Sequence, residues 1–182
     1  MDLNNILGVL AAGSTANQIG QQFNIESNKV SSVITSALPT LIGAMQKNAA
    51  TESGASSLAK ALGDHSANTS FNIGKIDLTD GSKILGHILG NNSNSVISAL
   101  AKKTGTNNNQ VSSILAAIAP TLLGLLGKNQ KTSNTSTSGL GGMLGSILGG
   151  GSSSSGMGSI LGAALADKDG DGKPDILGGL FK

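Results

Sequence analysis

Near the C-terminus, the stretch DKDGDGKPD at residues 167–175 combines the residue types that bind a hard cation. Four carboxylates and one backbone carbonyl could act as ligands, namely Asp167, Asp169, Asp171, Asp175 and the carbonyl of Lys173. Ca²⁺ binds about six to eight oxygen atoms, and carboxylates at alternate positions of a glycine-containing turn can converge on one ion. Without a cation, the four negative charges would repel one another. The loop therefore predicts a Ca²⁺ site, and the alternative is a solvated acidic linker.

The spacing of this loop separates two kinds of calcium site. An EF-hand needs a bidentate Glu at its last position, where Gly178 stands instead. The order of Asp and Gly resembles the D-x-D-G-D-G-x-x-D loops of integrin-type repeats, in which the final Asp closes the site. Such a loop predicts weak to moderate affinity, with a Kd of roughly 10⁻⁴ to 10⁻³ M or somewhat tighter.

Residues that could support catalysis are few. The two histidines, His65 and His87, have no nucleophile at a recognisable spacing, and the chain contains no cysteine. No phosphate-binding G-x-x-x-x-G-K-[ST] loop occurs, and no paired carboxylates occur outside the acidic loop. We predict that His65 lies in a polar loop, that His87 lies on a helix surface, and that the protein is not an enzyme.

The stretch IGQQFNIESNKVSSVI at residues 19–34 fits the spacing of a helix-turn-helix, with Gly20 at the small position before the turn. A DNA reader also needs cations for the phosphates and donors for base edges, and Arg to guanine is the commonest specific contact. All 12 basic residues are Lys, and the second helix would present little beyond Asn28, Lys29 and two serines. DNA binding is therefore the alternative prediction, behind two short helices that cross in a bundle.

An internal repeat contains this stretch. Shifting the chain by 81 residues places NKVSSVITSALPTLIGAMQKN (28–48) on NQVSSILAAIAPTLLGLLGKN (109–129). Each copy carries apolar residues at the spacing of an amphipathic helix. These stripes are Val30, Val33, Ile34, Ala37, Leu38, Leu41, Ile42 and Met45, and Val111, Ile114, Leu115, Ile118, Ala119, Leu122, Leu123 and Leu126.

Pro39 and Pro120 lie inside the two stripes, where proline costs about 3 kcal/mol in an unbroken helix. The stripe keeps its phase through each proline, which predicts either a kink or a tight junction between two helices that share a buried face. Ser27 is the expected N-cap of the first copy, and Asn107 or Asn108 that of the second.

Shorter helical patterns surround the copies, and no stretch predicts a strand. They are NILGVL, ANQIGQQF, GASSLAKALGDH, KILGHILG and VISALAKK. Aromatic residues make up only 2% of the chain, so a core must be built from aliphatic side chains, which suits helix packing better than a sheet. We predict an all-α fold: a duplicated small helical bundle over residues 1–128, with repeat units at about 1–48 and 82–129. A flexible Gly/Ser-rich tether at 129–156 and a short helix with the acidic loop at 157–182 complete the prediction.

These residues resemble the YidB-like family of bacterial proteins, which is classed as a domain of unknown function. The resemblance is carried by KILGHILG, by ALAKKTGTNNNQVSSILAAIAPTLLGLLGKN, and by a glycine-rich tail that ends in an Asp-Gly loop. It implies a small all-α bundle and supplies no established activity.

The remaining expectations concern partners and location. The start, MDLNNILGVLAAG, is poor material for a secretory signal, which predicts a cytoplasmic protein and leaves secretion without a leader open. The apolar run from Ile114 to Gly127 is shorter than the roughly 18 residues that span a bilayer. GSILG segments in the tail predict docking on the bundle or self-association, and a membrane-active tail is a third alternative. The leading prediction is a non-enzymatic interaction or structural protein with a homo-oligomeric or other protein partner, with nucleic acid and membrane disfavoured.

Overall fold

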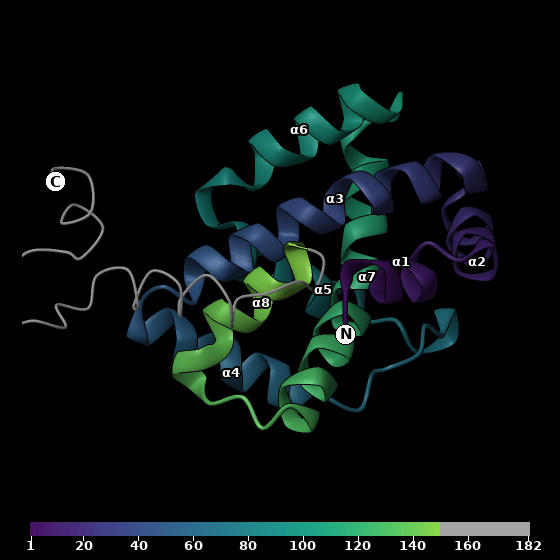
Figure 1. Cartoon of the computed structure of the whole chain (residues 1–182). Helices are drawn as coiled ribbons and strands as arrows, with labels where there is room; N and C mark the ends of the chain where they lie inside the picture. Colours follow the sequence, from purple (N-terminus) through teal and green to yellow (C-terminus); the bar gives the residue numbers. More distant parts are fainter. Residues whose placement is uncertain (150–182) are drawn as a thin grey trace, which may run out of the picture. The chain divides into compact units, whose positions relative to one another are not determined.

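The computed structural model describes residues 1–149, which form the helices α1 to α8 and include no strand (Figure 1). The helices are α1 (Leu3–Leu10), α2 (Gly13–Phe23), α3 (Ser27–Asn48), α4 (Glu52–His65), α5 (Leu78–Leu89), α6 (Ser93–Thr104), α7 (Asn108–Thr132) and α8 (Leu140–Leu148). Short 3-10 turns at 73–75, 90–92 and 137–139 join some of them. The predicted all-α class is confirmed.

The central element of residues 1–149 is α7, against which α1, α4, α5 and α6 all pack. It is long and apolar enough to cross a membrane by length and composition alone, yet 78% of its most apolar window is buried against the other helices. An apolar helix covered in this way is typical of the core of a helical bundle.

Both predicted stripes form the core. Every stripe residue of α3 is fully buried, and every stripe residue of α7 is at most 1% exposed. Burying a large aliphatic side chain contributes about 1.5 to 3 kcal/mol, so the two stripes supply much of the stability of the bundle.

The two prolines do not divide their helices, because α3 and α7 each run as one element past Pro39 and Pro120. The alternative of a tight junction between two helices is therefore wrong. The apolar stripe on both sides of each proline faces the same core, and its burial offsets the backbone hydrogen bond that proline cannot donate.

The caps of these helices differ. The Asn107 carboxamide accepts a hydrogen bond from the Gln110 backbone N–H at 2.9 Å, and the Asn107 N–H donates to the Gln110 side chain at 3.2 Å. This reciprocal capping box confirms Asn107 as the N-cap of α7. Ser27, the predicted cap of α3, is instead its first helical residue, because Glu26 occupies the capping position and makes no side-chain cap.

A tight turn precedes both long helices. Asn24 ends α2 at φ 52° and Gly105 ends α6 at φ 65°, both in the left-handed region. The Ile25 N–H then donates to the Gly20 carbonyl at 2.8 Å, and a Cβ on Gly20 would lie only 2.5 Å from the Ile25 oxygen. The helix-turn-helix spacing of the sequence therefore does correspond to two helices at a tight turn.

The structure changes the expected start of the tail. Residues 140–148, placed in the tether by the sequence, form α8, which packs on α3. Leu140, Leu144 and Ile147 are buried there, at the i, i+4, i+7 spacing of one helical face. The first of the apolar tail segments thus docks on the bundle, as the sequence predicted for one of two uses.

Close backbone contacts fix α4 and α5 on α7. A Cβ on Gly124 or Gly127 of α7 would collide with backbone at the C-terminal part of α4 or just after it, and a Cβ on Gly81 of α5 would collide with the Ala116 carbonyl of α7. Only glycine permits these approaches. The two shorter helices therefore lie directly on α7 and frame the space between them.

Candidate functional site

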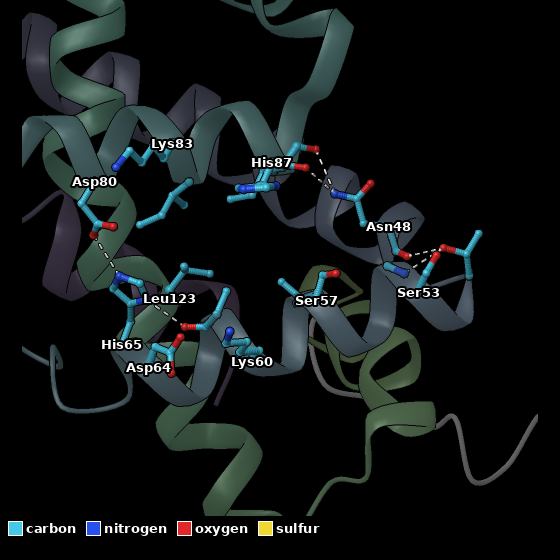
Figure 2. A pocket seen from close by; sticks show the side chains of 16 residues that line it. Asn48, Ser53, Ser57, Lys60, Asp64, His65, Asp80, Lys83, His87 and Leu123 are labelled. Atoms are coloured by element: carbon cyan, nitrogen blue, oxygen red, sulfur yellow. Dashed lines mark hydrogen bonds and ion pairs between the residues drawn. The ribbon is translucent and has the colours of Figure 1, made fainter.

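Between α4 and α5, over α7, the bundle leaves a groove with a volume of about 660 Å³ (Figure 2). Thr51 caps the start of α4 by accepting from the Gly54 N–H, and Asp77 caps the start of α5 by accepting from the Thr79 and Asp80 N–H groups. These caps satisfy backbone donors at the first turn of each wall. The groove is thus built by two independently capped helices on a common floor.

The floor of the groove is apolar and its rim is polar. The floor consists of Leu58, Ala61, Ile84, Ile88 and Leu123. The rim carries Asn48, Thr51, Ser53, Ser57, Lys60, Asp64, His65, Asp80, Lys83 and His87. An apolar floor with a few convergent polar groups is the usual composition of a binding site.

His65, the last residue of α4, joins the two walls. Its Nε2 lies 2.9 Å from Asp80 Oδ2 in the first turn of α5, and its Nδ1 lies 2.8 Å from the Ala61 carbonyl oxygen (Figure 2). The side chain of His65 is 17% exposed and that of Asp80 is 40% exposed. The contact is therefore partly screened from water on the histidine side.

This geometry suits a doubly protonated imidazole. The Ala61 carbonyl and the Asp80 carboxylate both accept, so the two ring nitrogens can donate to them at the same time only when His65 is protonated. Burial lowers the pKa of His65, but the Ala61 hydrogen bond and the Asp80 and Asp64 carboxylates outweigh it, and the pKa is raised above 6.5. The pair is an imidazolium–carboxylate contact when His65 is protonated.

Asn48, at the end of α3, holds the opposite end of α5. Its side-chain amide donates to the carbonyls of His87 and Ile88, both at 3.1 Å. These carbonyls belong to the last turn of α5, which the helix itself leaves without partners. One end of the α5 wall is thus attached to α3 by neutral hydrogen bonds, and the other end is attached to α4 by His65.

Two lysines face the groove from opposite walls, Lys60 from α4 and Lys83 from α5. Within residues 1–149, the ion pairs are Lys29 with Glu26 and His65 with Asp80, so neither groove lysine is in an ion pair there. The same part of the chain contains no group of three His, Cys, Asp or Glu residues that could hold a metal ion. Asp80 is paired with His65 and Asp64 is the other carboxylate that lines the groove, so the groove is suited to binding through its apolar floor and its two lysines.

The structure describes some of the predicted site residues and not others. The calcium-loop residues Asp167, Asp169, Asp171, Lys173 and Asp175 lie outside the described residues. His87 lies exposed on α5 as predicted, whereas His65, predicted in a polar loop, ends α4 because Leu62 is buried on α7 and the following residues complete that turn.

Sequence reasoning missed the groove itself. The only signal was that α4 and α5 each carry a histidine and an acidic residue at the edge of an apolar face. Such an edge is also what any solvated helix presents.

Several polar residues at the starts of α3 and α7 make local contacts in the structure. Lys29 lies 3.6 Å from the Glu26 carboxylate, and Gln110 belongs to the capping box of α7. The backbone N–H of Lys29 donates to Asn28 at 2.7 Å. Lys29, Asn28 and Gln110 are thus each engaged in a contact within their own helix start.

A family model described as "Bacterial protein of unknown function (DUF937)" matches residues 6–129. The match includes all residues that line the groove, and α8 lies beyond it. Comparisons with curated proteins and with solved structures gave no match.

Proposed function

The chain belongs to this bacterial DUF937 family, and we propose that it is a non-enzymatic interaction protein whose groove binds a short amphipathic helix of a protein partner. The observation that carries the proposal is the groove between α4 and α5, whose floor is apolar. Apolar grooves between helices are a common recognition site for helical peptides.

The chain itself offers an example of such an occupant. Helix α8 covers a neighbouring surface of α3 with three apolar side chains at i, i+4 and i+7. The groove is lined along α4 from Ser53 to His65 and along α5 from Asp80 to Ile88, which corresponds to about 18 Å and about 12 Å. Two to three turns of a partner helix have roughly this length.

Charge narrows the chemistry of the partner. Lys60 and Lys83 flank the apolar floor from the two walls and have no ion-pair partner within residues 1–149. A helix that carries carboxylates on both sides of an apolar stripe would match them, because opposite charges across an interface favour both encounter and register. The expected partner is therefore an acidic amphipathic helix.

The test is selection of helical peptides from a displayed library against the intact chain. The expected result is enrichment of peptides with apolar residues at i, i+4 and i+7 that are flanked by Asp or Glu. A Ser57→Glu variant, which places a charge on the groove rim, should weaken the selected peptides by about tenfold, or roughly 1.4 kcal/mol.

Ser56→Glu is the matched control, because Ser56 is the neighbouring exposed serine on α4 and does not line the groove. Binding that responds equally to both variants, or enrichment without the acidic apolar pattern, would overturn the proposal.

The absence of catalysis is part of the same proposal. Both ring nitrogens of His65 already contact acceptor atoms of the protein, which favours holding a proton over accepting one from a substrate. The other groove residue with a titratable imidazole, His87, has no nucleophile hydrogen-bonded to it within residues 1–149. The groove is expected to bind a partner without transforming it.

For the C-terminal loop we propose Ca²⁺ binding by Asp167, Asp169, Asp171 and Asp175 with the carbonyl of Lys173. The support is the alternating Asp and Gly spacing of the sequence. Calorimetry with Ca²⁺ on the intact chain should give a binding isotherm that is lost in an Asp169→Ala, Asp171→Ala double variant. Flat traces from both proteins would contradict the proposal.

DNA binding is the alternative function, and the observation that favours it is the tight turn between α2 and α3. It predicts salt-dependent binding of a labelled duplex, and a Lys29→Gln variant should then reduce the affinity. Micromolar binding at low salt would promote this alternative above a protein partner.

The YidB-like identity, a cytoplasmic location and a homo-oligomeric partner also remain proposals that rest on the sequence. A membrane-active tail ranks behind them. Light scattering after size exclusion, with Ca²⁺ and with chelator, tests the oligomer and the acidic loop together. Liposome co-sedimentation tests the tail.

A further inference from the structure

The His65–Asp80 pair stands between two hollows of the bundle. His65, Asp64, Asp80 and Lys83 line the groove, and the same four residues line a second hollow of about 480 Å³ beside the segment that joins α4 to α5. The pair therefore forms part of the wall at this end of the groove (Figure 2).

The His65–Asp80 pair is the direct polar link between the two walls in the described part of the chain. Within residues 1–149, no other hydrogen bond or ion pair links α4 to α5. Both helices are held by α7, and α5 is also held at its far end by Asn48. At the His65 end, the walls are thus held by their packing on α7 and by one direct contact, which is titratable.

We propose that protonation of His65 closes this end of the groove and that loss of the proton releases it, so that pH sets the spacing of α4 and α5. The inference concerns regulation of the groove and rests on the proposed function for its biological use. The spacing itself is a property of the chain alone.

The chemistry follows from the two acceptors that flank the imidazole. Neutral His65 keeps only one N–H, so it can donate either to Ala61 or to Asp80. The other nitrogen then directs its lone pair at an oxygen, which replaces a hydrogen bond with repulsion. Because Ala61 belongs to α4 like His65, only the Asp80 contact joins the walls, and deprotonation either breaks this contact or leaves it without the positive charge on the ring.

The charged groups around His65 favour the same response. Asp64 and Lys60 face it from α4, Asp80 and Lys83 from α5, while Asp77 and Lys75 line the second hollow. The residues of α7 that line the two hollows are uncharged: Ala117, Pro120, Thr121 and Leu123. The carboxylates and lysines of this set balance one another, so the proton on His65 decides the net charge of this end.

The pKa of His65 is raised above 6.5, mainly by Ala61, Asp80 and Asp64 acting against burial, so the transition is expected above that pH. A pH range from about 5 to about 9 brackets it.

The absence of cysteine makes a direct measurement simple. Ser56 on α4 and Ser82 on α5 are exposed and line neither hollow, so Ser56→Cys and Ser82→Cys can carry a pair of spin labels without other reactive thiols. Pulsed electron–electron double resonance on the full chain, with no peptide added, should give a longer and broader distribution of distances between the labels at about pH 9 than at about pH 5.

Three further substitutions, each made in the spin-labelled chain, show which residue causes a shift. His65→Gln cannot titrate and should give one distribution at both pH values. Asp80→Asn should do the same, and it serves if His65→Gln does not fold. His87→Gln, which removes the other histidine of the groove, should keep the full shift.

An unchanged distribution in the parent, or a shift that persists in His65→Gln and Asp80→Asn, would overturn the proposal. Because no partner is present, this outcome is independent of whether the displayed library yields a ligand. A peptide that binds without any pH response would leave the proposed function intact and refute the inference.

Discussion

The two long helices α3 and α7 share 10 of the 21 residues aligned between 28–48 and 109–129, and they pack in different surroundings. In α3 one stripe is buried, and the opposite face includes exposed Thr35, Pro39 and Thr40. In α7 burial extends almost all round the middle of the helix, from Ile114 to Gly127, with Pro120 partly exposed. The apolar stripe therefore determines one buried face, and further burial depends on what else packs on the helix.

The positions that differ between the copies explain the second buried face. Thr35 and Gln46 of α3 are exposed, and the residues 81 positions later, Ala116 and Gly127, are buried. Each replacement in α7 is smaller and less polar. Small residues let α4 and α5 approach the α7 backbone, so α7 becomes the floor of the groove.

The largest expected effect comes from a glycine that both helices share. A Cβ on Gly124 would meet backbone atoms of Asn68 and lie 2.8 Å from the His65 carbonyl oxygen, whereas a Cβ on Gly43, the matching position in α3, meets nothing within 4 Å. We expect Gly124→Ala to lower the free energy of unfolding by about 3 kcal/mol. Gly43→Ala should raise it by roughly 0.5 to 1 kcal/mol, because alanine is the better helix former.

Urea denaturation of both variants measures these changes. Equal effects at the two positions would show that the difference in packing between α3 and α7 is smaller than described.

A second pair exchanges residues between the copies. Ala116→Thr inserts a β-branched, polar side chain at a buried position that contacts Gly81, and should destabilise by about 2 kcal/mol. Thr35→Ala on exposed α3 should be neutral or stabilise by a few tenths of a kcal/mol, about the difference in helix propensity. Thermal unfolding followed by circular dichroism separates the two, and a costly Thr35→Ala would contradict the comparison.

The helix starts provide a smaller contrast. Asn107→Ala removes the capping box of α7 and should cost about 1 kcal/mol. Glu26→Ala removes a capping residue of α3 that makes no side-chain cap, and should cost less than about 0.5 kcal/mol. Chemical denaturation of both variants checks this order, and Asn107→Asp, which retains the acceptor, should recover most of the loss.

The smallest effect concerns pH and the His65–Asp80 pair, which lies beside α7. The pKa of His65 is raised in the folded state, so its contribution to stability is fully present below about pH 6.5 and is lost as pH rises through the raised value. Because the pair is partly exposed, the contribution should stay below about 1 kcal/mol.

Denaturation of the parent and of His65→Gln at about pH 5 and about pH 9 measures it as a difference. A parent that gains stability relative to the variant as pH rises would have the opposite sign and refute the assignment.

Much of the fold was predictable, and the groove was not. The stripes of α3 and α7, the cap at Asn107 and the turn at Gly20 were all predicted from short-range spacing. The continuous course of α3 past Pro39 was one of two alternatives that the sequence left open, because the cost of the proline is offset by burial that a partner helix supplies. The docking of residues 140–148 as α8 was also left open. Three apolar residues on one helical face do not specify which surface they will cover.

The sequence by itself determined the helices and their inward faces, because the 3.6-residue period of apolar side chains is a local property. Only the tertiary structure decided that His65 meets Asp80 and that a groove lies beside them. The two residues are 15 apart on different helices. They come together because Gly81, Gly124 and Gly127 let both helices lie against one central helix, a crossing that no local pattern specifies.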